Sequence, residues 1–175
     1  MTIAGLRSTL GDRNDATLDA MGDLGILYSR NNRFDEAEQL LRAVVENDEA
    51  MRGPDHPTSL STKSNLAQLL VRRGNLQEAV PILEQILATR RRILGDDHRE
   101  TLIAINNLAE AYVRARRDSE AETLYIESIE RRRRVLGENH PDLATAYNNL
   151  GQLYKRTGRM DEALAQFAKV VDIRV

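Results

Sequence analysis

Arginine and amide side chains recur along this chain at a fixed interval of 42 residues, and both types can bind an extended polypeptide. A guanidinium group binds a carboxylate or phosphate through two parallel hydrogen bonds, so a row of arginines could capture acidic groups. An asparagine side chain offers a donor and an acceptor, so a row of asparagines could hold a peptide main chain whatever its sequence. The residues that recur at these two positions are Arg30, Arg72, Arg114 and Arg156, and Asp23, Asn65, Asn107 and Asn149.

Both rows also have structural explanations. An arginine near the end of a helix is favourable beside the partial negative charge of the helix C-terminus, by about 0.3–1 kcal/mol. The asparagines could equally form hydrogen bonds to adjacent repeats. A third position lies between the two rows and would share the same helix face. The residues at this third position are Ile26, Gln68, Glu110 and Gln152.

The three histidines, His56, His98 and His140, share the 42-residue interval. A zinc site needs three or four ligands around one ion, and no second ligand recurs close to these histidines. We therefore expect the histidines to pack in loops or to cap helices, with no metal and no cofactor. The chain also lacks the P-loop, nucleophile-elbow and zinc-protease motifs. The sequence thus predicts a protein that is not an enzyme.

The elements that position these side chains follow from one repeat, residues 53–94. Two prolines and a glycine make 53–57 a loop, and Pro57 suits the first turn of a helix. Apolar residues at helical spacing between 60 and 70 predict a first helix, which ends at Gly74. A second apolar stripe, between 76 and 87, predicts a second helix that ends before Gly95. Neither helix would be stable alone, so the two must pack as a hairpin and the hairpins must stack.

Small and aromatic residues recur at the helix contacts in the pattern Leu-Gly-x-x-Tyr, followed by Ala-x-x-x-Phe or a variant of it. These residues are Leu24, Gly25, Tyr28, Ala37 and Leu41 in one repeat, and Leu150, Gly151, Tyr154, Ala163 and Phe167 in another. The pattern resembles the tetratricopeptide repeat. The 42-residue period, with Leu-Gly-Glu-Asn-His-Pro at 136–141, resembles the kinesin-light-chain subtype. The resemblance implies an all-α fold, a right-handed α-solenoid of stacked antiparallel helix hairpins with about four repeats.

The expected organisation is one array over residues 1–175. Residues 1–10 would end a preceding helix, and the repeats would span 11–52, 53–94, 95–136 and a truncated 137–175. The resemblance also implies that the polar faces of the first helices line a concave groove, which would place the recurring amides and arginines inside it. Near the end of the chain, we expect Val170, Val171 and Ile173 to be partly uncovered.

Composition narrows the range of partners. A net charge of −2, 4% aromatic residues and no tryptophan argue against binding to nucleic acid or to a membrane surface. The arginine runs 90–92 and 131–134 are expected to spread around helix ends and to favour solubility. The absence of cysteine fits a reducing compartment, and we expect a cytoplasmic protein.

The sequence therefore predicts a non-catalytic scaffold for protein–protein interaction. Its groove would bind an extended, acidic or phosphorylated peptide segment of a protein partner. The first repeat carries 5 basic and 10 acidic side chains, which favours a basic residue at one end of that peptide. The alternative is a structural or sensor arm of a larger signalling protein, linked to a kinase or nucleotide switch. Such an arm would associate weakly with itself through its uncapped terminal repeats.

Overall fold

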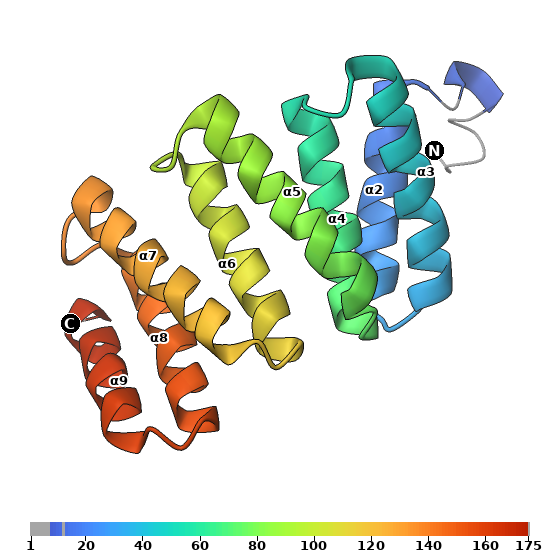
Figure 1. Ribbon diagram of the computed structural model, residues 1–175. Coiled ribbons are helices and arrows are strands. Elements are labelled where there is room, and N and C mark those ends of the chain that lie inside the picture. The colour runs from blue at the N-terminus through green and yellow to red at the C-terminus, as the bar shows by residue number, and fades with distance from the viewer. Residues whose placement is uncertain (1–7, 12, 175) are drawn as a thin grey trace. The chain divides into compact units, whose positions relative to one another are not determined.

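Helices account for nearly all of the chain that the computed structural model describes, residues 8–11 and 13–174. After the helical residues 8–10, eight helices follow. They are α2 (Asp15–Arg30), α3 (Phe34–Arg52), α4 (Pro57–Arg73), α5 (Leu76–Leu94), α6 (Arg99–Arg114), α7 (Asp118–Leu136), α8 (Pro141–Arg156) and α9 (Met160–Arg174). Successive helices form antiparallel pairs joined by short turns (Figure 1). The predicted all-α repeat fold, with about four helix pairs, is confirmed.

The chain forms two compact units, Met1–Ile82 and Leu83–Val175. In the first unit, α2 packs on α3 and α3 packs on α4. In the second unit, α6 packs on α7, α7 on α8, and α8 on α9. None of the helices in the described residues is long and apolar enough to cross a membrane.

Each first helix begins at a residue that caps it. The His56, His98 and His140 side chains accept a hydrogen bond at Nδ1 from the backbone N–H two residues later, at 3.2, 3.2 and 3.1 Å. Asn14 does the same for α2, with its Oδ1 3.0 Å from the backbone nitrogen of Ala16. These bonds satisfy a backbone donor that a helix N-terminus leaves without an intrahelical partner. Helix capping, one of the two roles expected for the histidines, is therefore what the structure shows.

The turn inside each hairpin requires a left-handed residue. Gly74 and Gly158 fill this position in two repeats, with φ of 87° and 81°. Asn32 and Arg116 fill the equivalent position in the other two, with φ of 60° and 61°. Asparagine tolerates this conformation better than most residues, whereas arginine has a side chain that clashes there. The turn after α6 is thus held against an unfavourable backbone preference.

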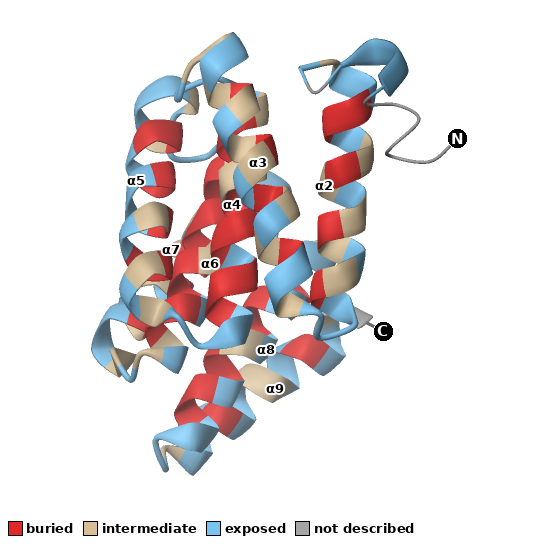
Figure 2. Cartoon of the chain, turned by 90° about the vertical axis from the view of Figure 1, so that its right-hand side faces the viewer, coloured by how far each residue is buried: buried red, intermediate tan, exposed pale blue. Residues whose placement is uncertain are grey.

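Small residues bring paired helices close together. Ala37, Ala121 and Ala163 have no exposed surface. A Cβ atom added to Gly25 would lie 2.9 Å from Leu41 Cγ, and one added to Gly151 would lie 2.6 Å from Phe167 Cε1. Buried positions recur turn by turn along the helices between exposed ones (Figure 2). The contacts that the repeat pattern implies are therefore the contacts that hold these hairpins.

The last helix differs in one respect from the sequence-based expectation. Val171 is 61% exposed and Ile173 is half-buried, as expected. The prediction for Val170 is wrong, since this side chain is buried. Val170 follows Ala163 by two helical turns and lies on the same side of α9, which packs against α8.

Candidate functional site

The polar side chains predicted to bind a partner converge in the first unit, between α2 and α4. A groove of about 190 Å³ lies between these helices, and we call it the α2–α4 groove. Two apolar residues from the first helices and Leu41 of α3 form its apolar part. The full lining is Ile26, Ser29, Arg30, Leu41, Asn65, Gln68, Leu69 and Arg72. The groove thus contains the residues at all three recurring positions of the second repeat and at two of those of the first. They are Asn65, Gln68 and Arg72, and Ile26 and Arg30.

The cations of this groove have no acidic partner in the part of the chain that the structure describes. Within the described residues, no carboxylate lies within ion-pair distance of Arg30 or Arg72. The Arg72 Nη1 donates to the Ser29 hydroxyl at 3.3 Å, and its guanidinium lies 5.9 Å from the centre of the Phe34 ring. Both arginines are exposed. Their charges are therefore available to an anionic ligand.

Asn65 is half-buried in the same groove. Its side-chain amide forms no hydrogen bond to the described residues, so its donor and acceptor are both open to a ligand. Gln68 is exposed one turn further along α4. Asp23 is exposed on α2 but does not line the groove.

In the second unit, the equivalent arginines are already paired. The Arg114 Nη2 donates to Glu110 Oε1 at 3.2 Å, one turn back on α6. Arg156 forms an ion pair with Asp118, the first residue of α7. Asn107 and Asn149 are half-buried, and Gln152 is exposed. The row of four arginines thus divides into two with an internal carboxylate and two without.

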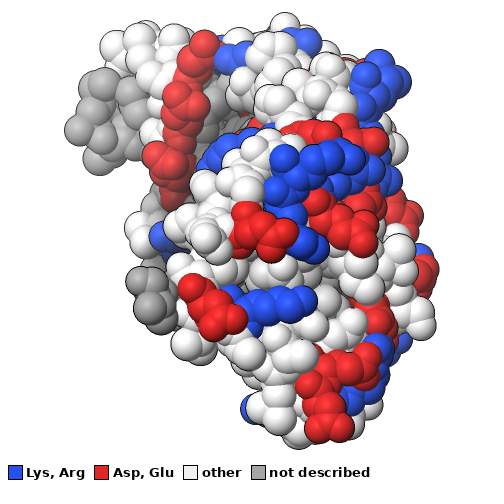
Figure 3. Space-filling view, turned by 90° about the vertical axis from the view of Figure 1, so that its left-hand side faces the viewer, with Lys and Arg blue, Asp and Glu red and all other residues white. Residues whose placement is uncertain are grey.

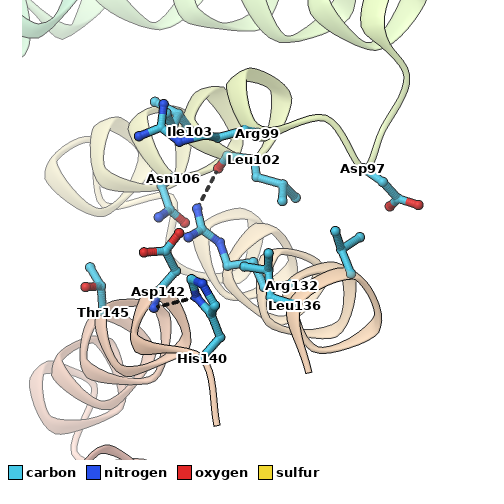
Figure 4. Close-up of a pocket in the computed structure, with 11 residues that line it drawn as sticks. Asp97, Arg99, Leu102, Ile103, Asn106, Arg132, Leu136, His140, Asp142 and Thr145 are labelled. Atoms are coloured by element: carbon cyan, nitrogen blue, oxygen red, sulfur yellow. Dashed lines mark hydrogen bonds between the residues drawn. The ribbon is translucent and has the colours of Figure 1, made fainter. Parts of the chain in front are cut away.

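A second hollow, in the same unit as these paired arginines, was not predicted from the sequence. It has a volume of about 440 Å³ and lies between the start of α6, the end of α7 and the start of α8 (Figure 4). We call it the Arg132 pocket. Its lining residues are Asp97, Arg99, Leu102, Ile103, Asn106, Arg132, Val135, Leu136, His140, Asp142 and Thr145.

One arginine of each run, 90–92 and 131–134, is buried. Arg90 is 3% exposed and Arg132 is 6% exposed. Each points inward from its helix because consecutive residues of a run face different directions, and one of them must face the neighbouring first helix. Burial lowers the pKa of both guanidinium groups below the usual value for arginine, and a nearby carboxylate opposes this effect in each case. Arg90 and Arg132 lie 42 residues apart, and this shared repeat position could have indicated that both are buried.

Tyrosine, arginine and glutamate form a repeated clamp between hairpins of the second unit. Arg117 lies 4.0 Å from the centre of the Tyr112 ring, and Arg159 lies 4.1 Å from that of Tyr154. The Tyr112 hydroxyl donates to Glu84 at 2.7 Å. Burial, with this carboxylate, raises the pKa of Tyr112 to about 12. The recurrence of tyrosine and arginine five residues apart could have revealed the clamp.

Charges of both signs cover the molecular surface. Figure 3 shows Lys and Arg interleaved with Asp and Glu on one face, rather than gathered into a large field of one sign. No group of three or more His, Cys, Asp or Glu side chains among the described residues could hold a metal ion. The side chains of the α2–α4 groove supply hydrogen-bonding groups and positive charge.

Comparisons with known proteins agree with the repeat fold. Two tetratricopeptide repeat families match the chain, one at residues 58–128 and 114–174 and the other at 17–58. No curated protein matches it. Among solved structures, it is similar to a putative kinesin light chain with nearly identical TPR-like repeats from Podosopora anserina. A crystal structure of a variant of that protein has 27% sequence identity and a TM-score of 0.84, over 98% of this chain and 81% of that chain.

Two further structures support the same likeness. A second structure of the Podosopora anserina protein has 27% identity and a TM-score of 0.81, over 98% of this chain and 82% of that chain. BtubC (BKLC) from P. vanneervenii has 27% identity and a TM-score of 0.79, over 98% of this chain and 68% of that chain.

Proposed function

The chain belongs to the tetratricopeptide repeat family, and from that premise we propose that it binds an extended, acidic peptide segment of a partner protein along its first helices. The fold is generally a protein-interaction module and typically non-catalytic. The similar structures are kinesin-light-chain-like, in agreement with the subtype expected from the 42-residue period. A cytoplasmic location, expected from the sequence, is part of the proposal.

The observation that carries the proposal is the composition of the α2–α4 groove. It holds two arginines without a carboxylate partner and an asparagine amide without a hydrogen bond, among the described residues. A guanidinium at an exposed site gains from a carboxylate or phosphate, because the two groups match in geometry. The amide of Asn65 can hold the peptide main chain, while Arg30 and Arg72 bind acidic side chains. Asp23, outside the groove on α2, favours a basic residue at one end of the ligand.

The Arg72→Gln variant tests this proposal. We expect its affinity for an acidic peptide to fall about tenfold, because a hydrogen bond to a charged group contributes about 1.5–3 kcal/mol. The probe is a fluorescein-labelled peptide of alternating Glu and Ser, blocked at both ends, and the measurement is fluorescence anisotropy. Binding should weaken as salt is added.

Arg114→Gln is the matched control, since Arg114 occupies the same position but already pairs with Glu110. Its affinity should fall less than that of Arg72→Gln. A peptide with Gln in place of Glu should bind weakly to every variant. Equal affinities for the wild type and Arg72→Gln, at equal stability in urea, would rule out the α2–α4 groove as the binding site.

Self-association is the second candidate function, and exposed apolar residues on α9 favour it. Met160, Leu164 and Val171 are 51%, 60% and 61% exposed. They share one side of the helix because their spacing is close to whole turns. Sedimentation velocity at increasing concentration should then show a rising average mass that Leu164→Lys abolishes. A single monomeric species over the whole concentration range contradicts this second candidate.

A further inference from the structure

The Arg132 pocket combines a buried cation with apolar walls. Leu102 and Ile103 of α6 form one wall, and Val135 and Leu136 of α7 form another. Val135 is 49% exposed and Leu136 is 38% exposed, so part of this apolar surface is accessible. Polar side chains of α6 and α8 complete the rim. Figure 4 shows the Arg132 side chain reaching in from α7 toward Leu102 and Asp142.

Arg132 is satisfied only in part. Its Nε donates to the Ser128 hydroxyl at 3.2 Å, and its Nη2 donates to the Leu102 carbonyl oxygen at 3.2 Å. Both acceptors are neutral. The remaining Nη1 has no acceptor among the described residues, and no carboxylate of that part of the chain lies within 4 Å of the guanidinium. A buried guanidinium that has no ion-pair partner would be stabilised by a negatively charged group beside it.

The equivalent arginine one repeat earlier is fully paired. The Arg90 Nη2 lies 3.1 Å from Glu100 Oε2, and its Nη1 donates to the Glu100 carbonyl oxygen at 3.0 Å. The residue 42 positions after Glu100 is Asp142, whose side chain is shorter by one methylene group. Asp142 is close enough to raise the pKa of Arg132, but it does not form an ion pair with it. The exchange of Glu for Asp therefore leaves space beside a guanidinium that has no ion-pair partner among the described residues.

We propose that the Arg132 pocket binds a carboxylate group that is attached to an aliphatic side chain, as at the C-terminus of a peptide or at an acidic residue beside an apolar one. The carboxylate accepts a hydrogen bond from Arg132 Nη1. The aliphatic group lies against Ile103, Val135 and Leu136. The pocket volume of about 440 Å³ is within the range of small-ligand sites. This site is separate from the α2–α4 groove, and its test does not depend on peptide binding there.

The electrostatics of the pocket favour a single negative charge over several. Asp142 and Asp97 also line it, but Asp97 is neutralised by ion pairs with Arg131 and Arg134. Arg99 also lines the pocket, and its Nη1 forms an ion pair with Glu100 Oε1 at 3.3 Å. Asp142 opposes a second carboxylate, so a doubly charged phosphate should bind less well than a carboxylate. This opposition also makes Asp142 the residue at which the proposal is most easily tested.

The experiment is NMR titration of the ¹⁵N-labelled chain with three probes, read at the Arg132 Nε–Hε signal. N-acetyl-leucine carries the free carboxylate, N-acetyl-leucine amide lacks it, and N-acetyl-Leu-Glu-Leu-amide carries it on a side chain. We expect N-acetyl-leucine or the glutamate peptide to shift the signal at about millimolar concentration, which is the range of such small ligands. Whichever of the two binds more tightly identifies the source of the carboxylate. The neutral amide should leave the signal unchanged.

Two variants of one residue provide the matched comparison. Asp142→Glu restores the side chain that pairs with Arg90 one repeat earlier, so it should pair with Arg132 and weaken binding of the better probe about tenfold or more. Asp142→Asn keeps the size and removes the charge, so binding should be unchanged or tighter. Both variants keep Arg132 and its hydrogen bonds to Ser128 and Leu102, so both should fold. Equal binding of the neutral amide, no binding of either carboxylate, or equal effects of the two variants would each overturn the proposal.

Discussion

Replacing Ile105 with alanine is expected to lower the free energy of unfolding by about 2–5 kcal/mol, the cost of a large-to-small change in a packed core. Ile105 lies in α6 and has no exposed surface. Its loss leaves a cavity that neighbouring helices cannot fill without moving, because each hairpin is held only by its neighbours. The measurement is urea unfolding followed by far-UV circular dichroism.

Ile126→Ala is the control for this prediction. Ile126 lies on the adjacent helix α7 and is 38% exposed, so the same chemical change removes fewer contacts. We expect its cost to be less than half that of Ile105→Ala. Similar losses for both variants would mean that burial at α6 does not determine the stability of this unit.

Replacing Ala121 with leucine should destabilise the chain by about 1–3 kcal/mol or more through overpacking. Ala121 lies in α7 and has no exposed surface, at the position where every repeat of this chain carries alanine. A leucine there must push α7 away from α6, which packs against it. Thermal unfolding measures the effect, which should appear as a lower melting temperature with little change in helix content at low temperature.

Ser119→Leu adds a similar side chain at an exposed position of the same helix. It should change the melting temperature little, because the added carbon atoms face solvent. A melting temperature for Ala121→Leu equal to that of Ser119→Leu contradicts the close approach of α6 and α7.

The helix pairs could be predicted because the signals repeat. Each first helix has a capping residue, an apolar stripe and a glycine, asparagine or arginine in the following turn, all at the same interval. The sequence also brought together Asn65, Gln68 and Arg72, because residues three and four apart share a helix face. These three residues lie on one helix, α4, so its periodicity alone places them side by side.

The ion pairs of the recurring arginines were not predicted from the sequence. Arg72 and Arg114 occupy the same position, yet only Arg114 has a glutamate one turn earlier on its own helix. Arg156 forms an ion pair with Asp118, the first residue of α7, which belongs to the preceding helix pair. Whether one of these arginines is paired depends on which residue lies near it in its own or the neighbouring repeat. The features that all repeats share do not show this difference.

The burial of Arg132 has a similar origin. Within a run of four arginines, helical periodicity shows that one side chain faces inward. It does not show whether a carboxylate lies close enough to pair with that side chain. The answer depends on the length of a single side chain, Asp142 against Glu100. Differences between repeats, rather than their likeness, therefore mark the positions that are open to a ligand.

We propose that the first helices of the first unit bind an acidic segment through two arginines that have no carboxylate partner, and one amide that has no hydrogen bond, among the described residues. The most direct measurement of this binding is NMR of the Asn65 amide and the Arg30 and Arg72 Nε–Hε signals during titration with the blocked Glu-Ser peptide. We expect these three side-chain signals to shift together, with one dissociation constant, and the shifts to disappear when Gln replaces Glu in the peptide. Saturable binding that leaves all three signals in place, while residues of α3 shift instead, would contradict it.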